Sequence, residues 1–475
     1  MNSKLTRRQQ IALRSFTYGV MTLAVLVGAA FCLFWAMGFR FDLQSGQISQ
    51  VALLQFNSFP TGATVSVNGA PLTSATPTRF NVKTGETTVE MTKSGYRAWS
   101  KTVNALPSSV RWLNYARLIP QNITTESIKS FAAVDQMAAS PDRRYLALHQ
   151  AADSRDITLV NLANPAKPQF STLTLDAAQL TAPSEGAADK IAIVEWDQGS
   201  RYLLLKHSVG DQVEYLELDR QNPTATKNLT RDFNMALADP HFSGTSGQVF
   251  FALTGTDLRK FDYGSQSVSA PLVSNVQNYR PYGGGRLAYV AAPTSGDKTQ
   301  QIVGIYDDGR AQTVKTYDDV APTLAEFAEY DGTQYLAVAR GDSVAIYQSP
   351  LSANAVAQPP ALKAAGRISQ FEFSPSGRFV LAADGQKFVS YDLETGETYA
   401  FELNQSGDPL NWIDDYHVAD YSGGAIALVE FDGGNRTRIV SGRGAAALST
   451  DGKYLFSLSD AAGGAVLQRS QLVLN

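Results

Sequence analysis

The sequence predicts an all-β ectodomain behind one N-terminal transmembrane helix, with a small β-sandwich followed by a β-propeller. Three observations predict this fold class: an uncharged apolar run near the start, short strands of alternating polarity after it, and a signature that recurs through the remaining chain. A chain of 475 residues is too long for one hydrophobic core, so two or more domains are expected.

The N-terminal segment contains the predicted membrane-spanning helix. Residues 15–39, between Arg14 and Arg40, carry no charge, and a helix of this length exceeds the hydrocarbon core of a bilayer, which is roughly 30 Å thick. Four cations precede this run and only Arg40 follows it closely, so the positive-inside rule places residues 1–14 in the cytoplasm. The remainder of a single-pass protein is then expected outside the cytoplasmic membrane.

The same segment allows one alternative, a cleaved signal peptide with Gly28 and Ala30 at the cleavage site. We favour an uncleaved signal anchor, because the apolar run is longer than a typical signal-peptide core and cleavage leaves the apolar terminus FCLFWAMGF.

Small residues at every fourth position of the same segment also form a stripe that lets two helices approach closely. A homodimer packed through this stripe is one prediction, and a helix without a partner is the other. The stripe consists of Ala24, Gly28, Cys32 and Ala36.

Composition and charge exclude several classes of function. The formal net charge is -4 and no cluster of Lys or Arg lies beyond residue 14, so nucleic-acid binding is not expected. Cys32 is the only cysteine, which excludes an internal disulfide framework and a cysteine-rich zinc site. The sequence has no phosphate-binding loop, serine-hydrolase elbow or zinc-protease motif, and no cofactor is predicted.

Residues 48–120 are predicted to form the small β domain. Short runs of alternating apolar and polar residues are separated by turn signals such as Asn68-Gly69, which is typical of antiparallel strands with one buried face. In the stretch FPTGATVSVNG, Pro60 fixes φ for a turn and Gly62 accepts a backbone that a larger residue resists. The residues predicted to face the core are Val65, Val67, Phe80, Val82, Val89 and Met91.

This region resembles the PEGA domain. The resemblance rests on PTGA followed by TVSVNG, then TGETTVEM, KSGYRAW and the closing ARLIP, with Thr61 in place of the glutamate of the family signature. It implies a β-sandwich in which the turn at Pro60 leads into the second strand, and an association with bacterial cell-envelope proteins. Tyr96 and Trp99 are expected to be core or edge aromatics rather than ligand-stacking residues.

From about residue 122 to residue 475 the sequence repeats at a spacing of roughly forty residues. Three copies of one signature, SPDRRYLALH, SPSGRFVLAA and STDGKYLFSL, each place a tight polar turn before a strand, and five degenerate copies complete eight such strands. Each is followed by another alternating strand, so a β-propeller of eight blades is predicted, with seven as the alternative. The last unit lacks a fourth strand, which Ile123–Phe131 is expected to supply, closing the ring. The pattern resembles the WD-repeat-like units of bacterial periplasmic propellers of the Tol-B type.

Residues that carry chemistry are few in this region. The four histidines, at positions 149, 207, 241 and 417, lie in different predicted blades without metal-ligand spacing, so unrelated strand histidines are expected. The acidic pairs at 307–308, 318–319 and 414–415 are not expected to share one ligand, because adjacent strand residues point to opposite faces. They are interpreted as turns. The stretch NWIDDYH is the most mixed aromatic and polar cluster, and its candidate binding residues are Trp412, Asp414 and His417.

These observations predict a membrane-anchored, extracytoplasmic binding or scaffold protein rather than an enzyme. The predicted partners are the membrane, through the N-terminal helix, and an envelope protein or cell-wall polysaccharide, through the propeller axis and the loops around it. No catalytic residue, metal site or cofactor is predicted. The alternative is a membrane-tethered hydrolase or lyase acting on glycan or peptide, with acidic residues gathered at the axis.

Overall fold

The computed structural model describes residues 7–36, 39–41, 48–151, 153–183, 189–294, 299–307, 309–352, 357–403, 411–461 and 463–474. The chain divides into two compact units, Met1–Asn122 and Ile123–Asn475, and each is described by itself.

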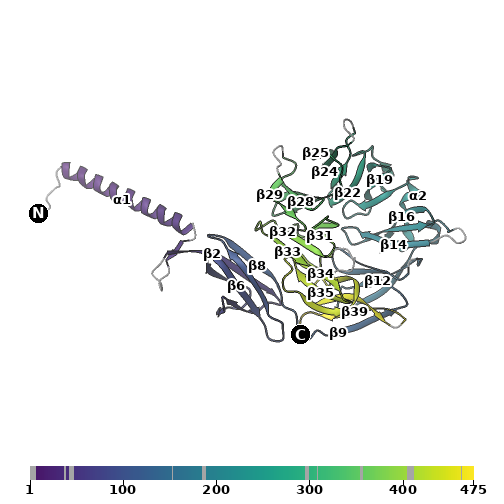
Figure 1. Cartoon of the computed structure of the whole chain (residues 1–475), viewed down its shortest axis with the longest axis horizontal. Coiled ribbons are helices and arrows are strands. Elements are labelled where there is room, and N and C mark those ends of the chain that lie inside the picture. Colours follow the sequence, from purple (N-terminus) through teal and green to yellow (C-terminus); the bar gives the residue numbers. More distant parts are fainter. Residues whose placement is uncertain are drawn as a thin grey trace. The chain divides into compact units, whose positions relative to one another are not determined.

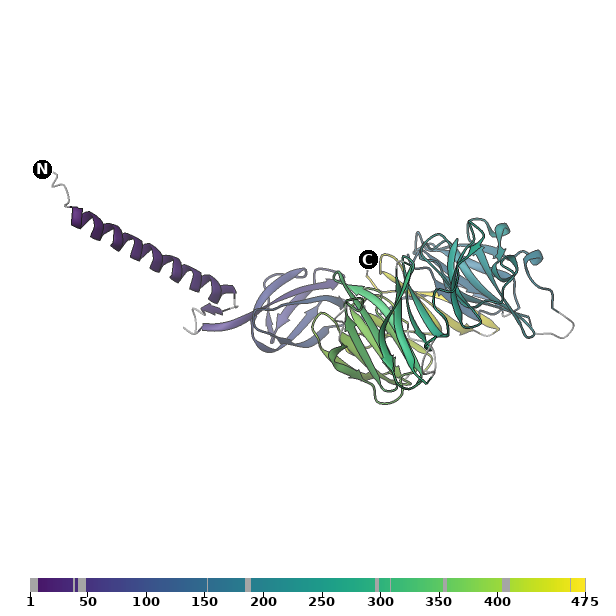
Figure 2. The ribbon, with the colours of Figure 1, turned by 90° about the horizontal axis from the view of Figure 1, so that it is seen from above.

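The N-terminal helix α1 runs from Arg7 to Ala36, a length of 30 residues (Figure 1). Figure 2 shows it as one continuous coil. Its stretch Ile11–Trp35 has a mean hydropathy of 2.0 and is 0% buried, so it is long and apolar enough either to cross a membrane or to belong to a signal sequence. The predicted range 15–39 differs from the helix at both ends: α1 begins before Arg14, and Phe39 lies in the short strand β1.

Two four-stranded sheets form the rest of the described part of this unit. Strand β2 is central to the first sheet, pairing antiparallel with β1 and β5 and parallel with β8, whereas the sequence predicted antiparallel pairing throughout. The first sheet contains β1 (Phe39–Phe41), β2 (Ile48–Phe59), β5 (Thr78–Lys83) and β8 (Val110–Arg117). The second contains β4 (Ala70–Pro71), β3 (Thr64–Val67), β6 (Gly85–Thr92) and β7 (Trp99–Ala105).

The predicted core of this unit is largely confirmed. Five of the six predicted residues are buried, but the prediction is wrong for Phe80, which lies opposite Leu54 on β5 and is 45% exposed. Tyr96 and Trp99 are 6% and 2% exposed, so both are core aromatics as predicted. The confirmed core residues are Val65, Val67, Val82, Val89 and Met91.

The opening motif carries the chain from the first sheet to the second. Strand β2 ends at Phe59 and β3 begins at Thr64 in the other sheet, with Gly62 at φ +81° in the turn between them. The Oγ1 atom of Thr76 accepts a hydrogen bond from Ala63 N at 2.9 Å and holds the start of the second sheet in place. The prediction that this turn leads into the second strand of a sandwich is confirmed.

The second unit is a β-propeller, with eight sheets in the part of the chain that the structure describes. This confirms the prediction of eight blades. Blades 1 to 4 are β10 (Gln136–Ala139), β11 (Tyr145–His149), β12 (Asp156–Asn161) and β13 (Gln169–Thr174); β14 (Asp189–Trp196), β15 (Tyr202–Val209), β16 (Gln212–Asp219) and β17 (Lys227–Asn228); β18 (Ala238–Phe242), β19 (Val249–Thr254), β20 (Asp257–Asp262) and β21 (Ser267–Val268); and β22 (Val276–Gly283), β23 (Arg286–Ala291), β24 (Gln301–Asp307) and β25 (Arg310–Tyr317). Blades 5 to 8 are β26 (Thr323–Tyr330), β27 (Thr333–Arg340), β28 (Ser343–Gln348) and β29 (Ala357–Lys363); β30 (Gln370–Phe373), β31 (Phe379–Asp384), β32 (Lys387–Asp392) and β33 (Thr398–Glu402); β34 (His417–Ser422), β35 (Ala425–Glu430) and β36 (Thr437–Ser441); and β37 (Arg443–Leu448), β38 (Tyr454–Ala461), β39 (Gly464–Gln471) and β9 (Thr125–Phe131). The short helix α2 (Leu229–Asp232) follows β17.

The ring closes as the sequence predicts. Strand β9, from the start of the unit, pairs antiparallel with β39 at its end and is the fourth strand of blade 8. An ion pair of 2.6 Å between Arg469 and Glu126 joins the same two strands. Blade 7 has three full strands, and its first strand is reduced to an isolated bridge between Trp412 and Val418.

The recurring signature folds into a recurring turn. In the first copy Ser140 Oγ donates to Asp142 Oδ1 at 2.6 Å and accepts from Tyr145 N at 3.0 Å. The copies at Ser374 and Ser449 likewise accept from the backbone N–H five residues later, at 3.1 and 3.0 Å. The fourth residue of each copy has positive φ: Arg143 +57°, Gly377 +75° and Gly452 +68°.

Candidate functional site

The first strand of each blade is its innermost strand. It occupies one edge of its sheet and contacts the first strands of the neighbouring blades, as β10 contacts β14 and β37, and as β26 contacts β22 and β30. Side chains on the first strands therefore lie near the propeller axis, where blades converge.

In three pairs of neighbouring blades, a side-chain oxygen on one first strand accepts the backbone N–H of the next. These bonds supply acceptors for N–H groups at the inner edge, where the sheet offers no further strand. They run to Gln136 Oε1 from Ile193 N at 2.7 Å, to Glu195 Oε1 from Phe242 N at 2.6 Å, and to Glu326 Oε2 from Phe373 N at 3.2 Å.

A cavity of about 630 Å³, here called the axial cavity, lies between the first strands of blades 1, 2 and 8 and residues 411–413 of blade 7. Trp412 lines it and stacks on Phe379, with 6.3 Å between ring centroids and 22° between ring planes. The indole Nε1 is buried and has no hydrogen-bond partner among the described residues. A buried Trp N–H usually has a partner, so this unpaired donor is unusual.

The wall beside Trp412 is fixed by hydrogen bonds between blades 7 and 8. Asn411 Nδ2 donates to Tyr421 Oη at 2.7 Å and to Ala446 O at 3.1 Å, and Ala446 N donates to Tyr421 Oη at 3.0 Å. Arg143, from the signature turn of blade 1, also lines the cavity. The axial cavity therefore combines a braced aromatic wall with a cationic side chain.

The acidic group of the axial cavity, Glu195, is already paired. Its Oε2 lies 2.8 Å from His241 Nδ1, and Asp239 lies 3.4 Å from the other ring nitrogen. Burial lowers the pKa of His241, but the hydrogen bonds to Asp239 and Glu195 outweigh it and raise that pKa to about 9. The imidazole is therefore charged at neutral pH and neutralises Glu195.

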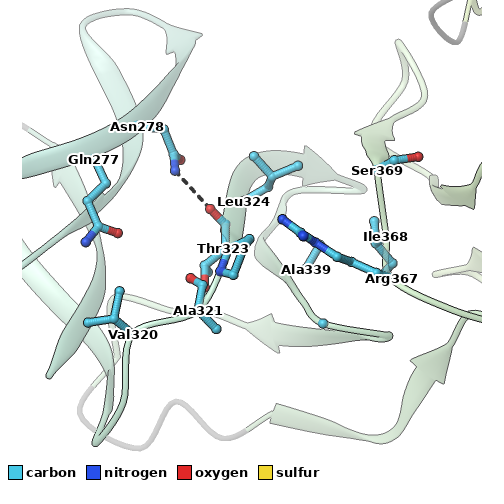
Figure 3. Close-up of a pocket in the computed structure, with 12 residues that line it drawn as sticks. Gln277, Asn278, Val320, Ala321, Thr323, Leu324, Ala339, Arg367, Ile368 and Ser369 are labelled. Atoms are coloured by element: carbon cyan, nitrogen blue, oxygen red, sulfur yellow. Dashed lines mark hydrogen bonds between the residues drawn. The ribbon is translucent and has the colours of Figure 1, made fainter. Parts of the chain in front are cut away.

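A second hollow, of about 820 Å³, lies where the first strands of blades 4 and 5 begin (Figure 3). Asn278 Nδ2 donates to Thr323 O at 2.9 Å across it, and the Arg367 side chain extends into it toward Leu324. We call it the rim hollow.

Two glutamates and one arginine meet between the first strands of blades 4, 5 and 6. Arg280 Nη1 donates to Glu326 Oε2 at 3.0 Å and to Phe371 O at 2.7 Å. Burial raises the pKa of Glu326 to about 7 against the opposing charge of Arg280. Burial and the neighbouring Glu326 raise the pKa of Glu372 to about 8, so Glu372 holds its proton at neutral pH. Glu372 Oε1 is buried without a hydrogen-bond partner in the described part of the chain.

The structure separates the three binding residues predicted from NWIDDYH. Trp412 lines the axial cavity, whereas Asp414 and His417 do not. Asp414 Oδ1 lies 2.7 Å from His417 Nδ1 and accepts from the backbone N–H groups of Tyr416 and His417, each at 2.9 Å. This carboxylate therefore organises the turn before β34, and His417 is 5% exposed.

The other predicted features have structural partners. All four histidines lie within 2.9 Å of a carboxylate oxygen, as His149 does of Asp135. Asp307 pairs with Arg286 at 3.1 Å and Asp319 with Arg340 at 2.9 Å, while Asp308 lies outside the described residues. Among the described residues, no group of three or more His, Cys, Asp and Glu side chains could hold a metal ion.

The charged residues near the propeller axis were not predicted from the sequence. Glu195, Glu326 and Glu372 lie on three different first strands, and only the closed ring brings Glu326 and Glu372 near each other. A weak signal was present: Glu195 and Glu372 each stand two residues before the polar turn of their copy, in VEWDQG and FEFSPSG.

A comparison with protein families agrees with the first unit. Residues 52–117 match the PEGA domain family, so the sandwich is a PEGA domain. A comparison with curated proteins gives no match.

Three solved structures similar to this chain share 11–12% sequence identity with it. A Dos1 propeller has a TM-score of 0.44, with 74% of this chain and 95% of that chain covered. Oligogalacturonate lyase from Vibrio parahaemolyticus has a TM-score of 0.40 over 74% and 97%, and Hsv2 from Kluyveromyces lactis has 0.38 over 72% and 99%. The family match and the sheets described above define a PEGA domain followed by a β-propeller, behind one apolar N-terminal helix.

Proposed function

We propose that this chain is a single-pass, membrane-anchored binding or scaffold protein that works outside the cytoplasmic membrane. In this proposal α1 is the anchor, residues 1–14 are cytoplasmic, and the propeller engages an envelope protein or cell-wall glycan at its axis. The observation that carries the proposal is the axial cavity, whose volume of about 630 Å³ lies in the range of ligand pockets and whose wall includes the aromatic side chain of Trp412.

The test is cross-linking in intact membranes followed by affinity purification and quantitative mass spectrometry. We expect the wild-type chain to recover a reproducible partner, and Trp412→Ala to reduce its recovery by about tenfold, as for an aromatic anchor of an interface. Val320→Ala is the matched control, because Val320 is 54% exposed but lines the rim hollow. Equal recovery by wild type and Trp412→Ala contradicts the axial proposal.

Protease digestion of whole cells, which should degrade both β units from outside, tests the topology.

A second candidate function is a hydrolase or lyase at the axis. It is favoured by Glu372 and Glu326, neighbouring carboxyl groups whose pKa values are raised to about 8 and about 7. General acid catalysis on glycosidic bonds uses a protonated carboxyl and a second carboxyl that flank the bond, about 5 to 9.5 Å apart. The test is turnover of glycan or peptide substrates that Glu372→Gln abolishes; turnover that persists in this variant contradicts it.

Dimerisation through α1 is the remaining proposal. Ala24, Gly28 and Cys32 of the predicted stripe are exposed, and a Cβ added at Gly28 meets no described atom within 4 Å. Gly28→Leu therefore fits the isolated helix and should shift a dimer in membranes to monomer. An unchanged oligomeric state in cross-linking contradicts packing through the stripe.

A further inference from the structure

The first sheet of the PEGA domain carries a hollow of about 470 Å³ on the face away from its core. Three strands contribute one residue each at the same level, because Gln55 of β2 is paired with Arg79 of β5 on one side and with Trp112 of β8 on the other. We call these three residues the cross-strand row. Leu54 and Phe56, on either side of Gln55, are buried, so the row points outward.

The side chains of the cross-strand row are available for binding. Trp112 is 45% exposed. Among the described residues, the Arg79 guanidinium, the Gln55 amide and the Trp112 indole N–H have no hydrogen-bond or ion-pair partner. Asn114 also lines the hollow with an unpaired side-chain amide, judged over the same residues. One exposed ring is thus surrounded by several unused polar groups.

The charged residues of β2, β5 and β8 are all basic. Strands β2, β5 and β8 contain no Asp or Glu, and Arg79 is the charged residue of the hollow. An unpaired guanidinium beside an aromatic face and without a competing carboxylate is complementary to a carboxylate that is held next to an apolar ring face.

We propose that the cross-strand row binds a glycan that contains a carboxylate-bearing sugar. The apolar C–H face of a pyranose ring packs on the Trp112 indole, Arg79 pairs with the sugar carboxylate, and the Gln55 and Asn114 amides bond to neighbouring hydroxyl groups. Side-chain amides both donate and accept hydrogen bonds, as hydroxyl groups do. The row therefore offers each of the three kinds of contact that an acidic sugar requires.

A peptide fits this surface less well. The backbone of β2 is hydrogen-bonded on both sides, to β5 and to β8, so its N–H and C=O groups are not available to a peptide main chain at this level. Peptide recognition by strand addition requires a free sheet edge rather than a sheet face. This argument favours the glycan.

The inference names a partner class that the proposed function leaves open, and it rests on that function only in placing the PEGA domain where a glycan is present. The site belongs to the first unit and uses no residue of the axial cavity. Failure at one site is therefore separable from failure at the other.

The test is isothermal titration calorimetry on the full chain in detergent micelles. Three tetrasaccharide probes are used: alternating N-acetylglucosamine and N-acetylmuramic acid, hyaluronan, and neutral chitotetraose. The first two carry their carboxylates on a lactyl ether and on a uronic acid, so they distinguish the source of the acid. We expect at least one acidic probe to bind about tenfold more tightly than chitotetraose, because only the acidic probes engage Arg79.

Variants assign the binding to the row. Trp112→Ala is expected to weaken acidic-probe binding by about tenfold, and Trp112→Phe to retain most of it because a ring remains. Arg79→Gln should remove the preference for acidic over neutral probes. Asn81→Ala, exposed on β5 outside the hollow, and Trp412→Ala in the axial cavity should leave binding unchanged.

Three results overturn the inference. They are no binding of either acidic probe, equal binding of acidic and neutral probes by the wild type, and binding by Trp112→Ala equal to that of the wild type. Tighter binding of a penta-aspartate peptide than of both acidic tetrasaccharides also overturns it, in favour of an acidic protein.

Discussion

The two units use their polar side chains in different ways. In the propeller, charged side chains are mostly paired internally: Arg378 lies 2.7 Å from Asp392 with both side chains buried, and His207 lies between two carboxylates at 2.6 Å each. In the PEGA domain, the cross-strand row leaves Arg79 and the Trp112 indole without partners among the described residues.

The difference follows from how each fold is held together. The sandwich has one continuous core between two sheets, so the outer face of a sheet is not needed for stability. The propeller has many short blades that must be tied to their neighbours, and Glu195 and Glu326 serve this purpose by accepting backbone N–H groups across blade boundaries. Polar groups that are both exposed and unpaired are therefore the better candidates for recognition, and Arg79 of the cross-strand row is one of them.

The largest expected effect comes from breaking a buried pair in the propeller. Arg378 and Asp392 have side chains that are 7% and 1% exposed, and Glu394 also contacts the guanidinium. Arg378→Met leaves the Asp392 carboxylate buried without its partner, so we expect the free energy of unfolding to fall by about 3–5 kcal/mol. Urea denaturation of the full chain, followed by circular dichroism, measures this change.

Arg79→Met is the matched variant in the PEGA domain. It removes the same guanidinium from an exposed site without a described partner, and we expect a change within about 0.5 kcal/mol. Equal losses for Arg378→Met and Arg79→Met contradict the contrast between the units.

A smaller effect is expected from the protonated glutamate at the axis. Burial and Glu326 raise the pKa of Glu372 to about 8, above its value in the unfolded chain, so the folded state binds this proton more tightly. The resulting stabilisation is complete below the unfolded-state pKa and is lost as the pH rises through 8. Glu372→Gln should therefore match the wild type near pH 4 and be more stable at pH 9, on the order of 2 kcal/mol.

The measurement is the urea midpoint of each protein across this pH range. Glu90→Gln is the control in the PEGA domain, since Glu90 lies exposed on β6 and water solvates its carboxylate. A difference between Glu372→Gln and the wild type that does not grow with pH contradicts a buried, protonated Glu372.

Local chemistry made most of the fold predictable. The signature around Ser140, Ser374 and Ser449 encodes a turn through contacts within about five residues, so each copy marks a blade on its own. Because the last unit lacks a fourth strand, Ile123–Phe131 was predicted to close the ring, and the pairing of β9 with β39 confirms this prediction. The two wrong predictions about the fold concern non-local structure. The parallel pairing of β2 with β8 and the exposure of Phe80 depend on which strands become neighbours.

The candidate sites were less predictable for the same reason. Trp412 was identified because its surroundings are mixed in sequence, but Asp414 and His417, from the same stretch, satisfy each other in a turn. Glu326 and Glu372 are 46 positions apart along the printed sequence and become neighbours only through the ring. The cross-strand row likewise combines residues of three strands whose register the sequence does not reveal.

The last comparison concerns two glycine turns, one in each unit. Gly377, in the signature turn of blade 6, has φ +75°, and a Cβ added there lies 2.6 Å from Glu329 O of blade 5. Gly62 in the PEGA turn has φ +81°, but its added Cβ meets only the flexible end of Lys93, at 3.2 Å from Nζ. Both alanine variants strain a left-handed backbone, and only Gly377→Ala also pushes one blade against the backbone of the next. We expect losses of about 2 kcal/mol for Gly377→Ala and about 1 kcal/mol for Gly62→Ala in the same urea measurement. The strain of the left-handed backbone is common to both variants, so the larger loss of stability expected for Gly377→Ala measures the close approach of the two blades. An equal loss for Gly62→Ala means that the blades adjust locally, and it contradicts the tight packing inferred between blades.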